Sequence, residues 1–276
     1  MKARGKGAGR QWVYVAILSA AAMCAPDAAV AQDQEGLAKK LQNPVADLIS
    51  VPLQNSFDFR VGPAHDGFRW TLNFQPVVPI SLNPDWNVIS RTILPVVYQS
   101  DIFPHSGTQF GLGDTLQSFF FSPAKPGAFI WGVGPVFLLP TGTHRYISGR
   151  KWGAGPTGVI LVQDSGWTYG ALANHIWSFA SSAGGNSRPE ISATYLQPFV
   201  NYTFKSATTL GLNAEMTYDW RAKQWTVPLQ ASISQLLAVQ KQPMQFSLAG
   251  RYWAARPDSA PTWGLRFSVT FLFPRQ

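Results

Sequence analysis

The stretch TWGLRFSVTFLF at residues 262–273 decides the fold class of this chain. Successive side chains of a β-strand point to opposite faces, so a strand here has one apolar face and one mostly polar face. The apolar face consists of Trp263, Leu265, Phe267, Val269, Phe271 and Phe273. The polar face consists of Gly264, Arg266, Ser268 and Thr270. We therefore predict a strand that separates an apolar from a polar environment, and three segments just upstream repeat the pattern.

The first 31 residues have the pattern of a secretion signal. An apolar core from Trp12 to Met23 is followed by a small-residue cleavage site at Ala29-Val30-Ala31. The basic residues that precede the core are Lys2, Arg4, Lys6 and Arg10. We predict a signal peptide over residues 1–31, cleaved after Ala31, and not a membrane helix. A lipoprotein would carry its lipid on Cys24, but Met23 is a poor residue before such a cysteine.

The composition of the remaining chain narrows the class of protein. Cys24 is the only cysteine, which excludes disulfides, thiol nucleophiles and cysteine-ligated metals after cleavage. Charged residues make up only 13% of the chain and aromatic residues another 13%. The charges are scattered, which argues against nucleic acid as a partner, and no cofactor is implied. A secreted chain without an apolar run of membrane-helix length predicts a closed β-barrel in the outer membrane of a Gram-negative bacterium.

Twelve segments have the length and pattern of membrane-crossing strands. Compact turns alternate with longer connections rich in glycine and charge, which is typical of the two ends of such a barrel. The first strand looks short and is expected to begin near Val51. The predicted strands are residues 55–61, 68–82, 86–99, 109–123, 128–141, 150–164, 167–180, 190–205, 208–220, 224–239, 242–255 and 262–273. The fold class is therefore all-β: an antiparallel transmembrane barrel of about 12 strands at residues 55–276.

Prolines fall inside several of these strands, where each one removes a ladder hydrogen bond. They are Pro76, Pro79, Pro95, Pro135, Pro156, Pro198 and Pro228. A closed barrel has no free edge that could accommodate them, so we expect β-bulges at these positions.

A periplasmic segment at residues 32–54 precedes the barrel. Leu37 and Leu41 are four residues apart and Pro44 follows, which predicts at most a short amphipathic helix. The helix would lie at the periplasmic mouth or fold into the lumen as a plug. A loosely ordered leader is the alternative.

Tryptophans concentrate near the predicted strand ends, which is typical of an aromatic girdle at the membrane interface. Those at predicted external ends are Trp70, Trp152, Trp177, Trp220, Trp225, Trp253 and Trp263. Trp86 and Trp167 lie at periplasmic ends, and only Trp131 lies further inside. The alternative is the general preference of aromatic residues for strands.

Stretches along nearly the whole mature chain resemble one family. They include NPVADLISVPLQN at 43–55, GLGD at 111–114, GPVFLLPT at 134–141, KWGAGPT at 151–157 and WTYGALANHIWSFA at 167–180. Others are LQPFVNYT at 196–203, TYDW at 217–220, QWTVPL at 224–229, RYWA at 251–254 and VTFLFP at 269–274. The sequence resembles bacterial outer-membrane proteins catalogued as "putative MetA-pathway of phenol degradation" or as transporters, and often mislabelled neuromedin U. The resemblance implies a barrel that moves small compounds, aromatic ones among them.

The expected partners follow from this setting. They are outer-membrane lipid and lipopolysaccharide, the barrel-insertion machinery during assembly, and a small-molecule solute. The insertion machinery commonly recognises a terminal aromatic residue, whereas here Phe273 is followed by three further residues.

Charged residues on the predicted lumen faces give the main candidate site. Glu215, Arg251 and Arg266 fall at one depth, and Asp219 lies on the same polar face of its strand as Glu215. Opposed charges across a lumen select solutes, so we expect a constriction there. A structural salt bridge that fills a narrow barrel is the alternative.

Two other classes of function have weaker sequence support. His65, His105 and His144 would have to converge from different loops to bind a metal. Twelve-stranded barrels include lipid hydrolases, and the pairs His105–Ser106 and His175–Ser178 contain the residue types of a nucleophile and its base. A structural or adhesive barrel is the third alternative.

Overall fold

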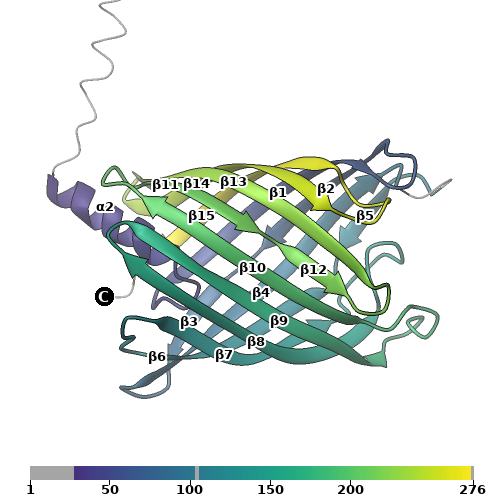
Figure 1. Ribbon diagram of the computed structural model, residues 1–276, viewed down its shortest axis with the longest axis horizontal. Helices are drawn as coiled ribbons and strands as arrows, with labels where there is room; N and C mark the ends of the chain where they lie inside the picture. Colours follow the sequence, from purple (N-terminus) through teal and green to yellow (C-terminus); the bar gives the residue numbers. More distant parts are fainter. Residues whose placement is uncertain (1–27, 103–105, 275–276) are drawn as a thin grey trace, which may run out of the picture.

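The computed structural model describes residues 28–102 and 106–274 of this protein (Figure 1). Within these residues, fifteen strands form one antiparallel sheet that closes into a barrel, and helix α2 (Ala28–Leu41) lies at one end of it. No helix in the described part is long and apolar enough to cross a membrane. The predicted signal peptide falls mostly on residues 1–27, which lie outside the described residues.

The fifteen strands make twelve crossings of the barrel wall, because three crossings are interrupted. The interrupted crossings are β2 with β3, β5 with β6, and β11 with β12. In chain order the first strands are β1 (Ile49–Val61), β2 (Gly67–Phe74), β3 (Val77–Ser81), β4 (Trp86–Ser100), β5 (Gln109–Leu112), β6 (Thr115–Pro123), β7 (Ile130–Leu139) and β8 (Lys151–Asp164). They are followed by β9 (Trp167–Ser181), β10 (Ser192–Thr203), β11 (Thr208–Ala214), β12 (Met216–Asp219), β13 (Gln224–Val239), β14 (Gln242–Ala255) and β15 (Trp263–Phe273).

The last strand closes the barrel against the first, as its pattern predicted. β15 pairs with β1 in unbroken antiparallel register from Ile49↔Phe273 to Phe59↔Trp263. Its side chains alternate between exposed and buried along most of its length, with the apolar positions outside. All-β architecture, antiparallel pairing and twelve crossings are therefore confirmed.

The boundaries differ from the predicted ones at the start of the chain. The prediction that the barrel starts at residue 55 is wrong, because β1 begins at Ile49. Pro52 does not end the strand, since it pairs with Thr270 and its carbonyl oxygen accepts a hydrogen bond from the Gln75 amide. A proline in a strand loses only its own donor and keeps its acceptor.

Prolines and one inserted residue account for the interruptions. Between β5 and β6, the crossing has one residue more than β4 at the position of Pro95, so the bulge expected there is confirmed. Gln75 and Pro76 separate β2 from β3, and Glu215 separates β11 from β12 opposite Pro228. The expected bulge is confirmed at Pro228, where the register of β13 with β14 shifts. At Pro135 and Pro198 it is wrong, since both pair without a shift.

The two ends of the barrel differ, and we name them by what they carry. The terminal end carries α2 and the end of β15, at the left of Figure 1, together with the compact turns. The loop end carries the longer connections, such as residues 140–150 and 182–191. α2 lies against β10, β11 and β13 at the terminal end.

Candidate functional site: the barrel lumen

The barrel wall has the opposite polarity to that of a water-soluble protein. Large apolar side chains are exposed on its outer face, for example Leu212, Leu248 and Phe267. The buried inner positions carry many polar side chains, among them Ser56, Asp58, Gln75, Gln99, Ser118, Thr209, Ser234, Gln245, Arg266, Ser268 and Thr270. This arrangement follows from the alternation in each strand and is typical of a transmembrane barrel.

Four charged side chains form a hydrogen-bonded charge network (Asp58, Glu215, Arg251 and Arg266) in the loop-end part of the lumen. Arg266 Nη1 donates to Glu215 Oε1 at 2.6 Å, and Arg266 Nη2 donates to Glu215 Oε2 at 3.0 Å. Arg251 Nη2 donates to Glu215 Oε2 at 3.3 Å, and its Nη1 donates to Asp58 Oδ1 at 2.7 Å. The structure thus brings together the three predicted residues Glu215, Arg251 and Arg266.

The charge network extends across an arc of the wall. Arg266 belongs to β15 and reaches Glu215 between β11 and β12, although β13 and β14 lie between them in the sheet. On a curved wall, such a contact requires both side chains to project into the lumen. Two carboxylates and two guanidinium groups balance in charge, so the network is neutral as a set.

Asp58 is the member of the charge network that the sequence reasoning missed. Its signal was the alternation SFDFRV in β1, where Phe57 and Phe59 face outward and Asp58 must face inward. Gly264, opposite Asp58 in β15, makes room for it: a Cβ there would lie 2.6 Å from Asp58 Oδ1. Ser56 Oγ lies on the same face and accepts a hydrogen bond from Arg266 Nε at 3.0 Å.

Asp219 and Trp253 do not lie where they were expected. The Asp219 carboxylate stays outside the charge network, because it accepts hydrogen bonds from the amides of Arg221 and Ala222 in the turn after β12. Trp253 was predicted in the external girdle, but it is only 6% exposed, and its ring lies 4.6 Å from the Arg251 guanidinium carbon. Trp253 lies opposite Pro228 and on the same face of β14 as Arg251, and the extra residue of the bulge at this point is Ala254 of β14.

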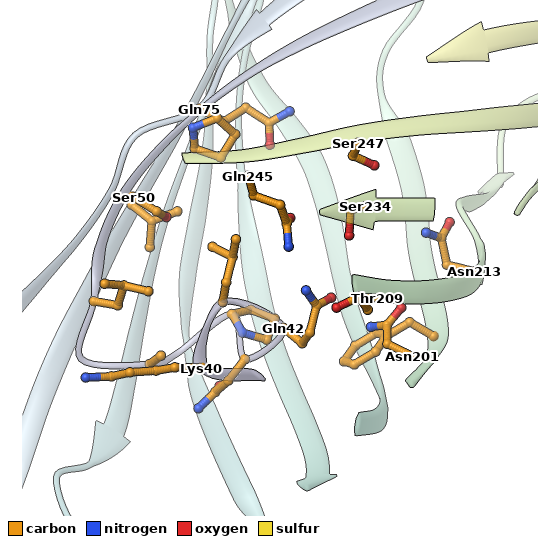
Figure 2. Close-up of a pocket in the computed structure, with 18 of the residues that line it drawn as sticks. Lys40, Gln42, Ser50, Gln75, Asn201, Thr209, Asn213, Ser234, Gln245 and Ser247 are labelled. Atoms are coloured by element: carbon orange, nitrogen blue, oxygen red, sulfur yellow. The ribbon is translucent and has the colours of Figure 1, made fainter. Parts of the chain in front are cut away.

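Two cavities lie on the inner side of the wall. The terminal cavity has a volume of about 270 Å³, and polar side chains from several strands surround it, including Asn201, Asn213 and Gln245 (Figure 2). The central cavity has a volume of about 330 Å³ and reaches Glu215 and Arg266 of the charge network. Both cavities are lined by Gln54, Gln75, Arg91, Leu172 and Gln197. They are therefore adjacent sections of one lumen.

The N-terminal segment lies in the terminal mouth of the lumen. Lys40, Gln42 and most of the residues from there to Leu48 line the terminal cavity, where Figure 2 shows Gln42 pointing toward Thr209 and Asn201. Gln163 Nε2 donates to the Lys39 carbonyl oxygen at 2.8 Å.

Two apolar clusters hold this segment in place. Val45 packs with the inward-facing side chains of Ile89, Phe120, Val159, Leu161 and Leu172. Ala38, Ala46 and Leu48 pack with Ala207, Leu236 and Leu272 on the other side. The segment therefore contacts opposite parts of the wall and narrows the terminal mouth.

Tryptophans of the predicted girdle lie on the outer face near the strand ends. Seven of them are between 38% and 55% exposed: Trp86, Trp152, Trp167, Trp177, Trp220, Trp225 and Trp263. Trp70 is half-buried, and its indole N–H donates to Asn55 Oδ1 at 3.2 Å.

Hydrogen bonds to two carboxylates order the long connections at the loop end. The Asp114 carboxylate accepts hydrogen bonds from Ser148 Oγ at 2.6 Å and from the amides of Gly142 and Gly149 at 3.1 and 2.7 Å. The Glu190 carboxylate accepts hydrogen bonds from Lys151 Nζ and from the Ser178 hydroxyl. These two bonds hold the pKa of Glu190 below its ordinary value.

The residues of the alternative sites do not converge in the described chain. Ser178 Oγ bonds to Glu190 on the inner side, whereas the ring of His175 lies against Trp177 and bonds to Thr194 Oγ1. No group of three histidine or acidic side chains comes together in residues 28–102 and 106–274. His105, which belongs to both the predicted metal site and the pair with Ser106, lies outside the described residues.

Comparison with solved structures supports the fold. An outer membrane channel from Pseudomonas putida F1 has a TM-score of 0.65 and 13% identity, over 82% of this chain and 96% of that chain. Outer membrane phospholipase A from Escherichia coli is less similar, with a TM-score of 0.46 and 9% identity over 83% of this chain and 90% of that one. No model of a protein family and no curated protein sequence matches the chain. The comparison therefore establishes a barrel of outer-membrane type, and the family suggested by the sequence stays a prediction.

Proposed function

We propose that this protein is a passive outer-membrane channel for small solutes. The observation that carries the proposal is the lumen itself: a polar inner wall encloses two adjacent cavities that share Arg91 and four other lining residues. The P. putida structure with the same fold is described as an outer membrane channel.

In this proposal the charge network is the constriction and the N-terminal segment is a plug. Arg266 and Glu215 fill part of the cross-section near the loop end, and solutes pass beside them. Residues 32–48 narrow the opposite mouth after residues 1–31 have been removed as a signal peptide. The barrel then begins with β1 at Ile49.

The orientation follows the usual arrangement of such barrels, with the terminal end in the periplasm and the loop end outside. The exposed tryptophans at both ends would sit at the two membrane interfaces, in contact with lipid and lipopolysaccharide. Phe273, which is exposed near the end of the chain, is the residue that the insertion machinery would recognise.

Liposome swelling tests the proposal directly. Purified protein in liposomes is diluted into isotonic solutions of sugars, amino acids and aromatic acids, the last because of the family resemblance of the sequence. Swelling above that of protein-free liposomes is expected for the smaller solutes. No swelling with any solute would contradict a channel and favour a structural barrel.

A further inference from the structure

We propose that the central cavity binds a small carboxylic acid with an apolar body, and that Arg91 holds its carboxylate. This inference rests on the proposed function, because it names the class of solute that the channel would carry. It uses a side chain that the charge network leaves out.

Arg91 differs from the arginines of the charge network in that no carboxylate of the described chain contacts it directly, although Glu215 and Arg266 line the same cavity. Arg251 and Arg266 each contact Asp58 or Glu215, whereas in the described residues no carboxylate oxygen lies within 4.0 Å of the Arg91 guanidinium. Its one hydrogen bond to a side chain runs from Nη2 to Gln75 Oε1 at 3.2 Å. A guanidinium group has five N–H donors, and a charge held inside a protein is costly without an opposite charge. Arg91 is therefore suited to bind an anion.

The position of Arg91 places this charge on the solute path. Arg91 lines both the terminal and the central cavity, so its guanidinium group is available to an anion in either of them. Gln75, which accepts from Arg91, in turn donates to Gln54 Oε1 at 2.8 Å, and this fixes its orientation. The donors of Arg91 that do not bond Gln75 remain for a ligand.

The lining of the central cavity suits an amphipathic small molecule, because it contains both apolar and polar side chains. One part is apolar and includes Leu116, Phe120, Leu172 and Ile176. The same lining carries the charged groups Arg91, Arg266 and Glu215, of which the last two bond to each other, and polar groups such as Tyr195. A volume of about 330 Å³ lies at the lower end of the range for small-molecule pockets. A ring or short chain with one carboxylate satisfies both parts, since arginine binds carboxylates with two parallel hydrogen bonds.

A second feature favours anions at the loop end. Arg145, Arg150 and Arg188 line a hollow of about 360 Å³ there. In the described chain these arginines donate to carbonyl and hydroxyl oxygens, and no carboxylate lies within 4.0 Å of the three guanidinium groups. Their field would raise the local concentration of anions before they enter the lumen.

Benzoate is the probe, with benzamide and acetate as controls. Benzamide keeps the ring without the charge, and acetate keeps the charge without the ring. Titration calorimetry on the detergent-purified full chain should give saturable benzoate binding that is at least about tenfold tighter than that of either control. Equal affinity for benzoate and benzamide would overturn the proposal, and this comparison needs no variant.

Arg91→Gln tests the assigned residue, and Arg69→Gln is its matched control. Arg69 also faces inward and bonds a glutamine, Gln99, but it lines neither cavity. We expect Arg91→Gln to weaken benzoate binding by about tenfold or more and Arg69→Gln to change it by less than about twofold. Equal losses in both variants would overturn the proposal.

The failure of this inference is distinguishable from the failure of the channel. If the unmodified protein makes liposomes permeable but benzoate does not bind, the solute class is wrong and the channel stands. If benzoate binds but no solute passes, the site stands and the proposed transport is wrong.

Discussion

The two halves of the lumen are built on different principles. The loop-end half is held by charge: Asp58, Glu215, Arg251 and Arg266 bond to one another across an arc of the wall. The terminal half is held by apolar packing, with Val45 of the N-terminal segment against Ile89, Phe120 and their neighbours. The first half consists of barrel strands alone, whereas the second needs a segment from outside the sheet.

This difference bears on what each half can do. Three members of the charge network belong to strands, Asp58 to β1, Arg251 to β14 and Arg266 to β15, and Glu215 lies in the break between β11 and β12. The network is therefore anchored in the wall itself. The N-terminal segment is attached through small apolar side chains and a hydrogen bond from Gln163. We therefore interpret the loop-end half as the fixed filter and the terminal half as the part that can be displaced.

The largest effect is expected from breaking the charge network. Glu215→Gln keeps the shape of the side chain but leaves Arg266 and Arg251 without their shared carboxylate. Removing one partner of a buried ion pair costs about 3–5 kcal/mol, so the variant should unfold at a markedly lower urea concentration. The measurement is urea unfolding in lipid vesicles, followed by the heat-dependent gel mobility of the barrel.

Asp219→Asn is the matched control for this variant. It changes a carboxylate of the same crossing that bonds only to the turn after β12, and it should cost about 1 kcal/mol or less. If Glu215→Gln is as stable as Asp219→Asn, the charge network does not hold the loop-end half of the lumen in place.

The next effect concerns the terminal half. Val45→Asp places a carboxylate among apolar side chains, and burying it costs more than the packing of the segment supplies. The segment should leave the mouth, and the conductance in planar bilayers should rise while the barrel stays folded. Val45→Leu keeps the site apolar and should leave the conductance unchanged. Equal conductance of the Asp and Leu variants would show that the segment does not narrow the mouth.

A smaller effect is expected at the loop end. Asp114→Asn weakens three hydrogen bonds that hold residues 142–149, at a cost of about 1–3 kcal/mol. Trypsin should then cut after Arg145 or Arg150 faster than in the unmodified protein. Asp164→Asn, in a turn at the terminal end, serves as the control. Unchanged cleavage in Asp114→Asn would mean that other contacts hold the connection.

The smallest effect is the pH dependence of the connection between β9 and β10. The pKa of Glu190 is lowered by its bonds to Lys151 and Ser178, so the bonds stabilise the connection above the ordinary carboxyl pKa. This contribution to stability is lost as the pH falls from the ordinary carboxyl pKa to below the lowered pKa of Glu190. In the unmodified protein, the amides of residues 182–191 should exchange their hydrogens faster in this acidic pH range, after correction for the intrinsic exchange rates. The Glu190→Gln variant should not show this increase in exchange at low pH. If the variant shows the same increase, a group other than Glu190 causes it.

The sequence predicted the loop-end half better than the terminal half, for a physical reason. Arg251 and Arg266 lie in strands with clean alternation, so their inward direction and common depth follow from counting residues. Ile89, Phe120 and Leu172 are apolar but face the lumen, where Val45 of the N-terminal segment packs against them. They are therefore exceptions to the pattern of apolar side chains on the outer face of the barrel. The alternation within one strand cannot predict a packing partner such as Val45, which is more than forty residues away in the sequence.

Two further differences concern features that alternation within one strand does not settle. Trp253 follows its strand parity inward and stacks on Arg251, although its place near the strand end favoured the girdle. The interruption at Glu215 depends on Pro228 of the neighbouring strand, and strand pairing has to be known before it can be placed.

Single-channel current through the unmodified protein in planar bilayers tests the central claim most directly. We expect discrete current steps in potassium chloride, because the two adjacent cavities of the lumen would also let hydrated ions pass. A protein that is folded and inserted but gives no current steps, even as Val45→Asp, would contradict the account.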